Sequence, residues 1–237
     1  KNAYQLLFFG QNKDSLNLAK LALKIYKKDA KLWLILSEAQ IANELYDNAL
    51  ISLKKAEEIN PALSEIYFTK SSIYLKKSKL KEAKTALKSG LKIAPNNPNA
   101  LFQLGNIYLI EKNYLKSIEI FDKAIKIKPD FWQALNNKGL VYFELDQLNL
   151  SIEYFEKTIE LADNAEPLLG LASCLLTKNI NLALELAKKA LAKNPNYLEY
   201  SYRKEQLWGT KIQTAAEELL KNKRLQEVIK QAKLRIN

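Results

Sequence analysis

Carboxylates at helical spacing are the first residues in this 237-residue chain whose types could do chemistry. Glu153, Glu156 and Glu160 lie three or four residues apart, so they share one face of a predicted helix. Paired carboxylates can serve as a general acid and a general base. Charged residues at this spacing also form ordinary solvated helix surfaces, and we expect such a surface here.

Residue types that other reactions need are missing or isolated. The chain has no histidine and one cysteine, which excludes a thiolate–imidazole pair and a cysteine-based zinc site. The six glycines are scattered and form no phosphate-binding loop. Cys174 lies in the apolar stretch LASCLL and is predicted to be a small core residue, not a reactive thiol. We therefore predict no enzymatic activity, no cofactor and no metal site.

Basic residues give the chain a formal charge of +11, which raises the question of an anionic partner. Only three of the 37 basic residues are arginine, the residue that phosphate and base recognition favour. A solvated lysine surface is therefore the preferred interpretation. Four lysines cluster at a predicted turn and form a candidate basic patch for an acidic protein, a phospholipid surface or a nucleic acid: Lys76, Lys77, Lys79 and Lys81.

The sequence repeats itself with a period of 34 residues, as the spacing of Pro61, Pro95 and Pro129 shows. When repeats start at residues 30, 64, 98 and 132, small residues align with small residues. The eighth position holds Ser37, Ser71, Gly105 and Gly139, and the twentieth holds Ala49, Ala83, Ser117 and Ser151. Large apolar residues recur at the twenty-fourth position: Leu53, Leu87, Phe121 and Phe155.

Each repeat contains two apolar stripes at helical spacing, separated by a short polar turn such as residues 111–113. Small side chains where the two helices cross let their backbones approach closely. A helix pair cannot bury both of its apolar faces alone, so it must stack on its neighbours. The sequence therefore predicts an all-α protein built as an α-solenoid.

The stretch NPNALFQLGNIYLIEKNYLKSIEIFDKAIKIKPD resembles a tetratricopeptide repeat over its full length. The resemblance implies a right-handed superhelix of about six helix pairs over residues 1–197. The implied units lie near 1–29, 30–63, 64–97, 98–131, 132–164 and 165–197, the last with one residue deleted in its turn near Thr177 to Asn181. Lys70 and Lys138 depart from the family pattern, which puts only local packing in doubt.

Residues 198–237 break the repeat and are predicted to be C-terminal capping helices, because an open stack exposes its last apolar face. We expect a helix from Leu198 to Trp208 and a second from Lys211 to about Lys221, started by a capping box of Thr210 and Gln213. A third helix follows. A partner-binding role for this tail stays open. The run EQLWG resembles tails of cyanobacterial repeat proteins, which points to a cyanobacterial or plastid assembly factor.

In tetratricopeptide repeat proteins the first helices of the units line a concave groove. By position, this resemblance implies a peptide groove made of Leu34, Phe68, Phe102, Gln103, Asn106, Asn136, Asn137, Leu140 and Phe143. Apolar side chains with central amides suit an amphipathic helix or an extended peptide. The alternative is that such residues pack against the adjacent unit. The family's carboxylate clamp for chaperone tails is not expected, since Glu166 and Gly170 stand where basic residues would be needed.

We interpret the protein as a scaffold or adaptor that binds a protein or peptide partner, for example during the assembly of a complex. The alternative is a repeat protein that binds nucleic acid or an anionic surface through its lysine-rich face; a nucleic-acid partner is not the expectation. No run of about 18 apolar residues is present, so we predict no membrane span and a cytoplasmic protein. The sequence begins at lysine and not at methionine. If an upstream membrane anchor was removed, we expect the protein to be membrane-peripheral.

Overall fold

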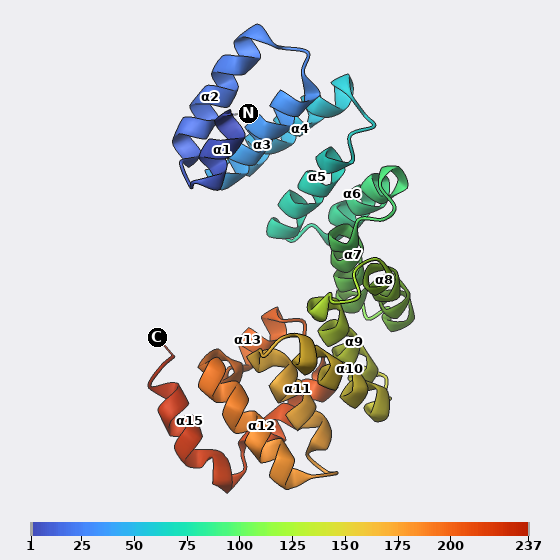
Figure 1. Ribbon diagram of the computed structural model, residues 1–237, viewed down its shortest axis with the longest axis vertical. Helices are drawn as coiled ribbons and strands as arrows, with labels where there is room; N and C mark the ends of the chain where they lie inside the picture. Colours follow the sequence, from blue (N-terminus) through green and yellow to red (C-terminus); the bar gives the residue numbers. More distant parts are fainter. Residues whose placement is uncertain (1, 237) are drawn as a thin grey trace. The chain divides into compact units, whose positions relative to one another are not determined.

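The computed structural model describes residues 2–236, and every regular element within them is a helix (Figure 1). The helices of the six repeat pairs are α1 (Asn2–Phe8), α2 (Asn12–Ile25), α3 (Ala30–Ala42), α4 (Tyr46–Ile59), α5 (Ser64–Lys76), α6 (Leu80–Ile93), α7 (Pro98–Ile110), α8 (Tyr114–Ile127), α9 (Trp132–Glu144), α10 (Leu148–Leu161), α11 (Ala165–Leu175) and α12 (Ile180–Lys193). The tail contains the 3-10 helices Pro195–Leu198 and Lys223–Leu225 and the helices α13 (Tyr200–Glu205), α14 (Thr210–Leu220) and α15 (Gln226–Lys233). None of the helices in this range has the length and apolarity needed to cross a bilayer.

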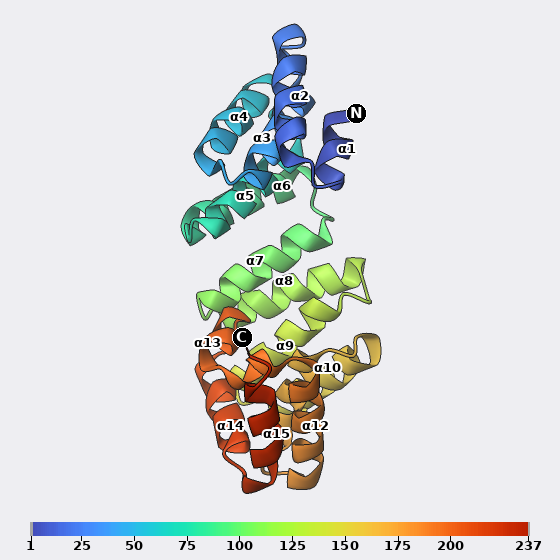
Figure 2. The same cartoon turned by 90° about the vertical axis from the view of Figure 1, so that its left-hand side faces the viewer.

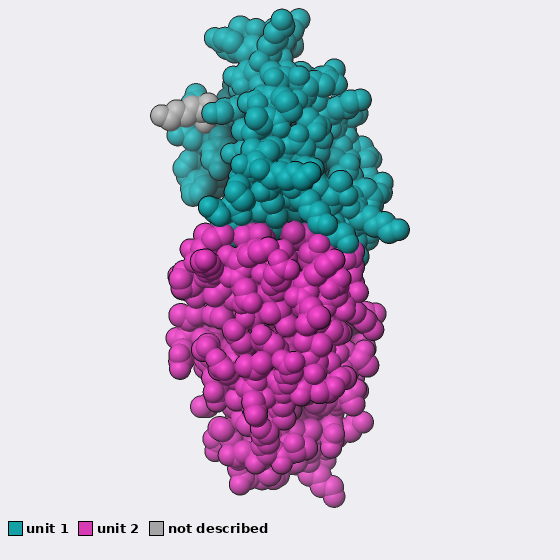
Figure 3. Space-filling view, turned by 90° about the vertical axis from the view of Figure 1, so that its right-hand side faces the viewer, with its two compact units in different colours: residues 1–100 teal, residues 101–237 magenta. Residues whose placement is uncertain are grey.

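The chain forms two compact units, residues 1–100 and residues 101–237, which Figure 3 colours separately. Each is a stack of antiparallel helix pairs, in agreement with the predicted all-α solenoid. The first unit holds α1 to α6. The second begins within α7 and includes the tail.

The 34-residue period is also present in the φ angles of the backbone. One residue in the turn of each of the first five pairs has a positive φ, between 56° and 72°: Gly10, Glu44, Ser78, Lys112 and Asp146. A side chain in this left-handed region is strained, so four of these turns carry a local cost. The sixth pair is irregular, because α11 has 11 residues where α3, α5, α7 and α9 have 13.

Close contact between the paired helices follows from the small residues that the sequence repeats. Ser117 Oγ donates to the carbonyl of Gly105 at 2.9 Å, and Ser151 Oγ repeats this bond to Gly139 at 2.8 Å. A Cβ atom on Gly105 would lie 2.4 Å from the Phe121 ring. The large residue at position 24 therefore fills the space that glycine leaves at position 8.

The tail packs onto the last helices of the second unit (Figures 1 and 2). Helix α14 lies against α9 and α11, and α15 lies against α12. Ile212, Ala216 and Leu219 of α14 are buried in one core with Leu140 and Leu169. The tail therefore covers apolar surface that the repeat stack would otherwise expose.

Two details of the predicted tail were wrong. The first helix is only α13, preceded by the 3-10 turn at Pro195, and Thr210 and Gln213 form no capping box. Glu144 of α9 instead accepts the backbone N–H groups of Lys211 at 2.9 Å and Ile212 at 3.1 Å. A carboxylate from another helix thus supplies the acceptor that the box would have provided.

Candidate functional site

The predicted groove residues lie on one side of the first helices of the repeats, which we call the inner face. In the first unit these helices are α3 and α5, packed by the repeat helices α1, α2, α4 and α6. Leu34 is buried in the core of that unit. Phe68 is half-buried, with its ring so close to Gly90 that a Cβ there would lie 2.4 Å from it. Ser72, at the groove's ninth position, is exposed.

Three asparagines of the second unit form an amide ladder on the inner face. Asn136 Nδ2 donates to Asn137 Oδ1 at 3.2 Å, and Asn137 Nδ2 donates to Asn106 Oδ1 at 2.8 Å. The ladder links α9 to α7. Asn136 Oδ1 is buried without a hydrogen-bond partner, as is Oε1 of Gln103. Buried acceptors of this kind are costly unless a donor arrives.

The ladder lines an opening of about 240 Å³, which we call the amide pocket. Phe102 and Trp132 add aromatic surface, and Phe102 packs against Phe131 with ring centroids 5.0 Å apart. Glu166 and the tail residues 205–207 complete the lining. The structure therefore brings four of the predicted groove residues together: Phe102, Asn106, Asn136 and Asn137.

The remaining predicted residues of the second unit lie elsewhere. Leu140 is fully buried in the core that α14 completes, and Phe143 is half-buried against the same core. These two side chains meet the chain's own tail. An external peptide would reach Leu140 only if α14 moved away.

Glu166 is a functional candidate that the sequence interpretation set aside. Its Oε1 accepts a hydrogen bond from Trp208 Nε1 at 3.1 Å. Burial raises the pKa of Glu166 to about 7, although hydrogen bonds from Asn136, Trp208 and Tyr197 favour the charged form. In the sequence, position 166 stood out only because it lacks the basic residue that a carboxylate clamp needs. The burial of Glu166 could not be predicted, because the tail that buries it is distant in the chain.

Arg203 of α13 holds the tail together and was not predicted to do so. Its guanidinium is 1% exposed and donates to Gln213 Oε1 at 2.7 Å and to the carbonyls of Tyr197 at 2.7 Å and Leu198 at 2.9 Å. All three arginines of the chain lie in the lysine-rich tail, and this was the one signal available, since the arginine fork suits several acceptors at once.

The other candidates for chemistry lie as follows. Glu153, Glu156 and Glu160 are exposed, and Glu153 pairs with Lys157 on the same helix at 2.6 Å. Cys174 is 2% exposed, and burial raises the pKa of its thiol to about 12. Within residues 2–236, no group of three or more Cys, Asp or Glu side chains is placed to hold a metal ion.

The candidate basic patch lies at the end of α5 and the start of α6. Lys76, Lys79 and Lys81 are exposed, whereas Lys77 is half-buried and pairs with Asp47 of α4 at 2.5 Å. One of the four charges is thus engaged within the first unit, which reduces the charge offered to an anionic partner.

Comparisons with known proteins agree with the helical repeat. A model of the tetratricopeptide repeat matches residues 30–63, 64–97, 98–131 and 133–164. No curated protein sequence matches the chain.

Similar solved structures include MamA, with 24% identity, a TM-score of 0.62, and coverage of 68% of this chain and 94% of MamA. YrrB has 19% identity, a TM-score of 0.65, and coverage of 79% of this chain and 97% of YrrB. PilF of Pseudomonas aeruginosa has 16% identity, a TM-score of 0.60, and coverage of 87% of this chain and 97% of PilF. Identities at this level support the shared fold alone.

The four repeat matches cover more than half of the sequence, and they coincide with the helix pairs from α3 to α10. The chain belongs to the tetratricopeptide repeat family.

Proposed function

We propose that this chain is an adaptor that holds a segment of a partner polypeptide on its inner face. Arrays of tetratricopeptide repeats are protein-interaction scaffolds, and this array offers an open polar pocket where α7, α9 and α11 meet. Amides in such a pocket suit the backbone of a bound peptide, because they both donate and accept hydrogen bonds. YrrB, one of the similar structures, is described as a TPR protein with an unusual peptide-binding site.

The observation that carries this proposal is the unsatisfied Asn136 Oδ1 in the amide pocket. The chain covers the apolar part of the second unit's inner face with α14 but leaves this acceptor without a donor. A partner that supplies an N–H group would remove the cost of burying it. Asn106 and Asn137 would then fix the register of the bound segment.

Site-specific photo-crosslinking in cells tests the proposal. A photoreactive residue is placed at Gln133 in the amide pocket or at exposed Ser72 on the first unit's inner face. Matched controls carry it at exposed Glu156 and Lys54, on the second helices α10 and α4. We expect the inner-face positions to capture a partner polypeptide that the controls do not capture. Equal capture from all four positions, or none from the inner face, would contradict the proposal.

A further inference from the structure

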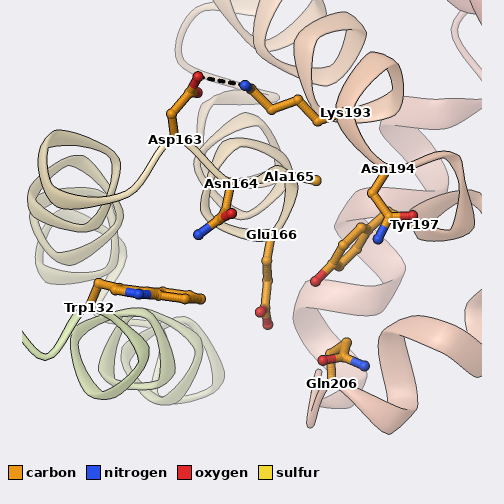
Figure 4. A pocket seen from close by; sticks show the side chains of 9 residues that line it. All are labelled: Trp132, Asp163, Asn164, Ala165, Glu166, Lys193, Asn194, Tyr197 and Gln206. Atoms are coloured by element: carbon orange, nitrogen blue, oxygen red, sulfur yellow. Dashed lines mark hydrogen bonds and ion pairs between the residues drawn. The ribbon is translucent and has the colours of Figure 1, made fainter. Parts of the chain in front are cut away.

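A second opening adjoins the amide pocket in the unit formed by residues 101–237. It has a volume of about 470 Å³ and shares Trp132, Glu166 and Gln206 with the amide pocket. Figure 4 shows the Glu166 carboxyl pointing into the space between Trp132, Tyr197 and Gln206. We call this opening the Glu166 pocket. The two openings together can hold a side chain and the backbone that carries it.

Glu166 has no cationic partner in the described part of the chain. Lys193 lines the same pocket, but its Nζ pairs with Asp163 Oδ2 at 2.5 Å on the rim (Figure 4). Its hydrogen bonds come from neutral groups only: Trp208 Nε1 donates at 3.1 Å, and Asn136 and Tyr197 also donate. A half-buried carboxylate that lacks a counter-charge is expensive, and the raised pKa of Glu166 reflects that cost.

Asn136 provides an independent observation. Its side chain is 1% exposed and lines the amide pocket, and its Oδ1 has no partner, while its Nδ2 is already used in the amide ladder. The free atom is therefore an acceptor. Asn136 Oδ1 thus lacks a donor, whereas Glu166, which already accepts a hydrogen bond from Trp208, lacks a cation. A positively charged N–H group would supply both.

Aromatic side chains border the same space. Trp132 and Tyr197 flank the Glu166 carboxyl in Figure 4. The faces of such rings attract cations, and the attraction grows when the site is shielded from water. An anionic ligand is disfavoured here, because Glu205 joins Glu166 in the lining of the amide pocket.

We propose that the Glu166 pocket binds the cationic side chain, guanidinium or ammonium, of a basic residue in a partner polypeptide. Glu166 is the ion-pair partner, Asn136 Oδ1 accepts a hydrogen bond, and Trp132 supplies a cation–π contact. This assignment rests on the proposed function and names the anchor of the bound segment. It gives a chain with a strong positive charge an acidic recognition site.

Nuclear magnetic resonance of the three tryptophan indole N–H groups tests the proposal on the full chain. Trp132 lines the Glu166 pocket and Trp208 donates to Glu166, whereas the Trp33 indole donates to the Lys27 carbonyl in the other unit at 2.9 Å. The probes are arginine and lysine, each blocked at both backbone ends. Citrulline with the same blocks is the neutral control, and putrescine represents a free small amine.

We expect the blocked arginine or lysine to shift the Trp132 and Trp208 signals at millimolar concentration while Trp33 stays unchanged. Citrulline should have no effect. Glu166→Gln should abolish the shifts, and Glu156→Gln, which removes the same charge from an exposed site on α10, should keep them. Trp132→Leu is the second variant, and a dispersed signal of Trp208, which lies in the same unit as both substitutions, verifies that each variant is folded.

Three results would overturn the proposal. They are equal shifts with citrulline, shifts that persist in Glu166→Gln, and no shift with either blocked residue. Putrescine binding about tenfold tighter than the blocked residues would assign the site to a small amine instead. The photo-crosslinking experiment is independent: capture at Gln133 that survives in Glu166→Gln would leave the adaptor function standing without this anchor.

Discussion

The inner faces of the two units are built from the same repeat, but different segments pack against them. In the first unit, α3 and α5 pack against neighbouring repeat helices, and Ser72 remains exposed. In the second unit, α14 lies across α9 and α11 and completes their core. The repeat therefore specifies how helices pair, whereas the sequence outside the repeat decides which part of the inner face stays exposed.

Removal of Arg203 should have the largest effect on this difference. In Arg203→Ala the carbonyls of Tyr197 and Leu198 and the side chain of Gln213 lose their donors inside the tail. We expect a loss of about 3–5 kcal/mol in the free energy of unfolding of the second unit, measured by urea denaturation. Hydrogen exchange should increase in α13 and α14 and stay unchanged in α3 and α5.

The neighbouring exposed residue provides the control, since Lys204→Ala should change stability by less than about 0.5 kcal/mol. Equal destabilisation of both units by Arg203→Ala would show that the tail does not act on the second unit alone.

The Glu166→Gln variant should change the pH dependence of stability. The folded pKa of about 7 lies above the ordinary value of 4.5, so the folded state keeps a proton that the unfolded state releases. Wild-type stability should therefore fall as pH rises from about 4.5 to about 7, and the variant should lack this fall. Above that range the variant should be more stable by at most about 3 kcal/mol.

Glu38 sharpens the same comparison in the first unit. Burial raises the pKa of Glu38, with a smaller effect from the nearby Glu65. Its ionisation should therefore also lower stability as pH rises, and Glu38→Gln should remove that loss. Thermal denaturation of wild type and both variants across this pH range is the measurement. A stability difference between wild type and Glu166→Gln that grows toward low pH would contradict the assignment.

Gly209 tests how closely the tail approaches α9. A Cβ atom there would lie 2.3 Å from the carboxyl carbon of Glu144, the residue that caps α14. We expect Gly209→Ala to cost about 2 kcal/mol in urea denaturation, because the cap and the backbone must separate.

Gly10→Ala in the first unit is the matched substitution, with open space around the added atom but a φ of 72°. It should cost about 1 kcal/mol through backbone strain alone. An equal cost at both glycines would argue against steric contact as the cause at Gly209.

The smallest effect is expected at the turns, where the two units are alike. Lys112→Gly and Ser78→Gly each remove a side chain from a left-handed backbone position, with φ of 56° at both. Each should raise stability by about 1 kcal/mol, seen as a higher melting temperature. If only one of the two substitutions stabilises its unit, the turns are not equivalent.

Sequence periodicity predicted the helix pairs because it is a local signal. The small residues at positions 8 and 20 recur every 34 residues, and the bond from Ser117 to Gly105 recurs from Ser151 to Gly139. The amide ladder was also within reach of the sequence, since Asn106 and Asn137 occupy the ninth and the sixth position of consecutive first helices, about one helical turn apart in the repeat. The helical spacing of 3.6 residues and the repeat spacing together fix which side chains face each other.

The tail's effect on the site depended on contacts that no spacing encodes. Glu144 caps a helix that begins 66 residues later, and Trp208 bonds Glu166 across 42 residues. Such pairs form only after the stack has brought distant segments together, so Leu140 could be predicted to face inward but not to be covered. Sequence by itself determined the helix pairing, whereas tertiary structure decided which carboxylate is buried, because burial depends on everything that packs around a group.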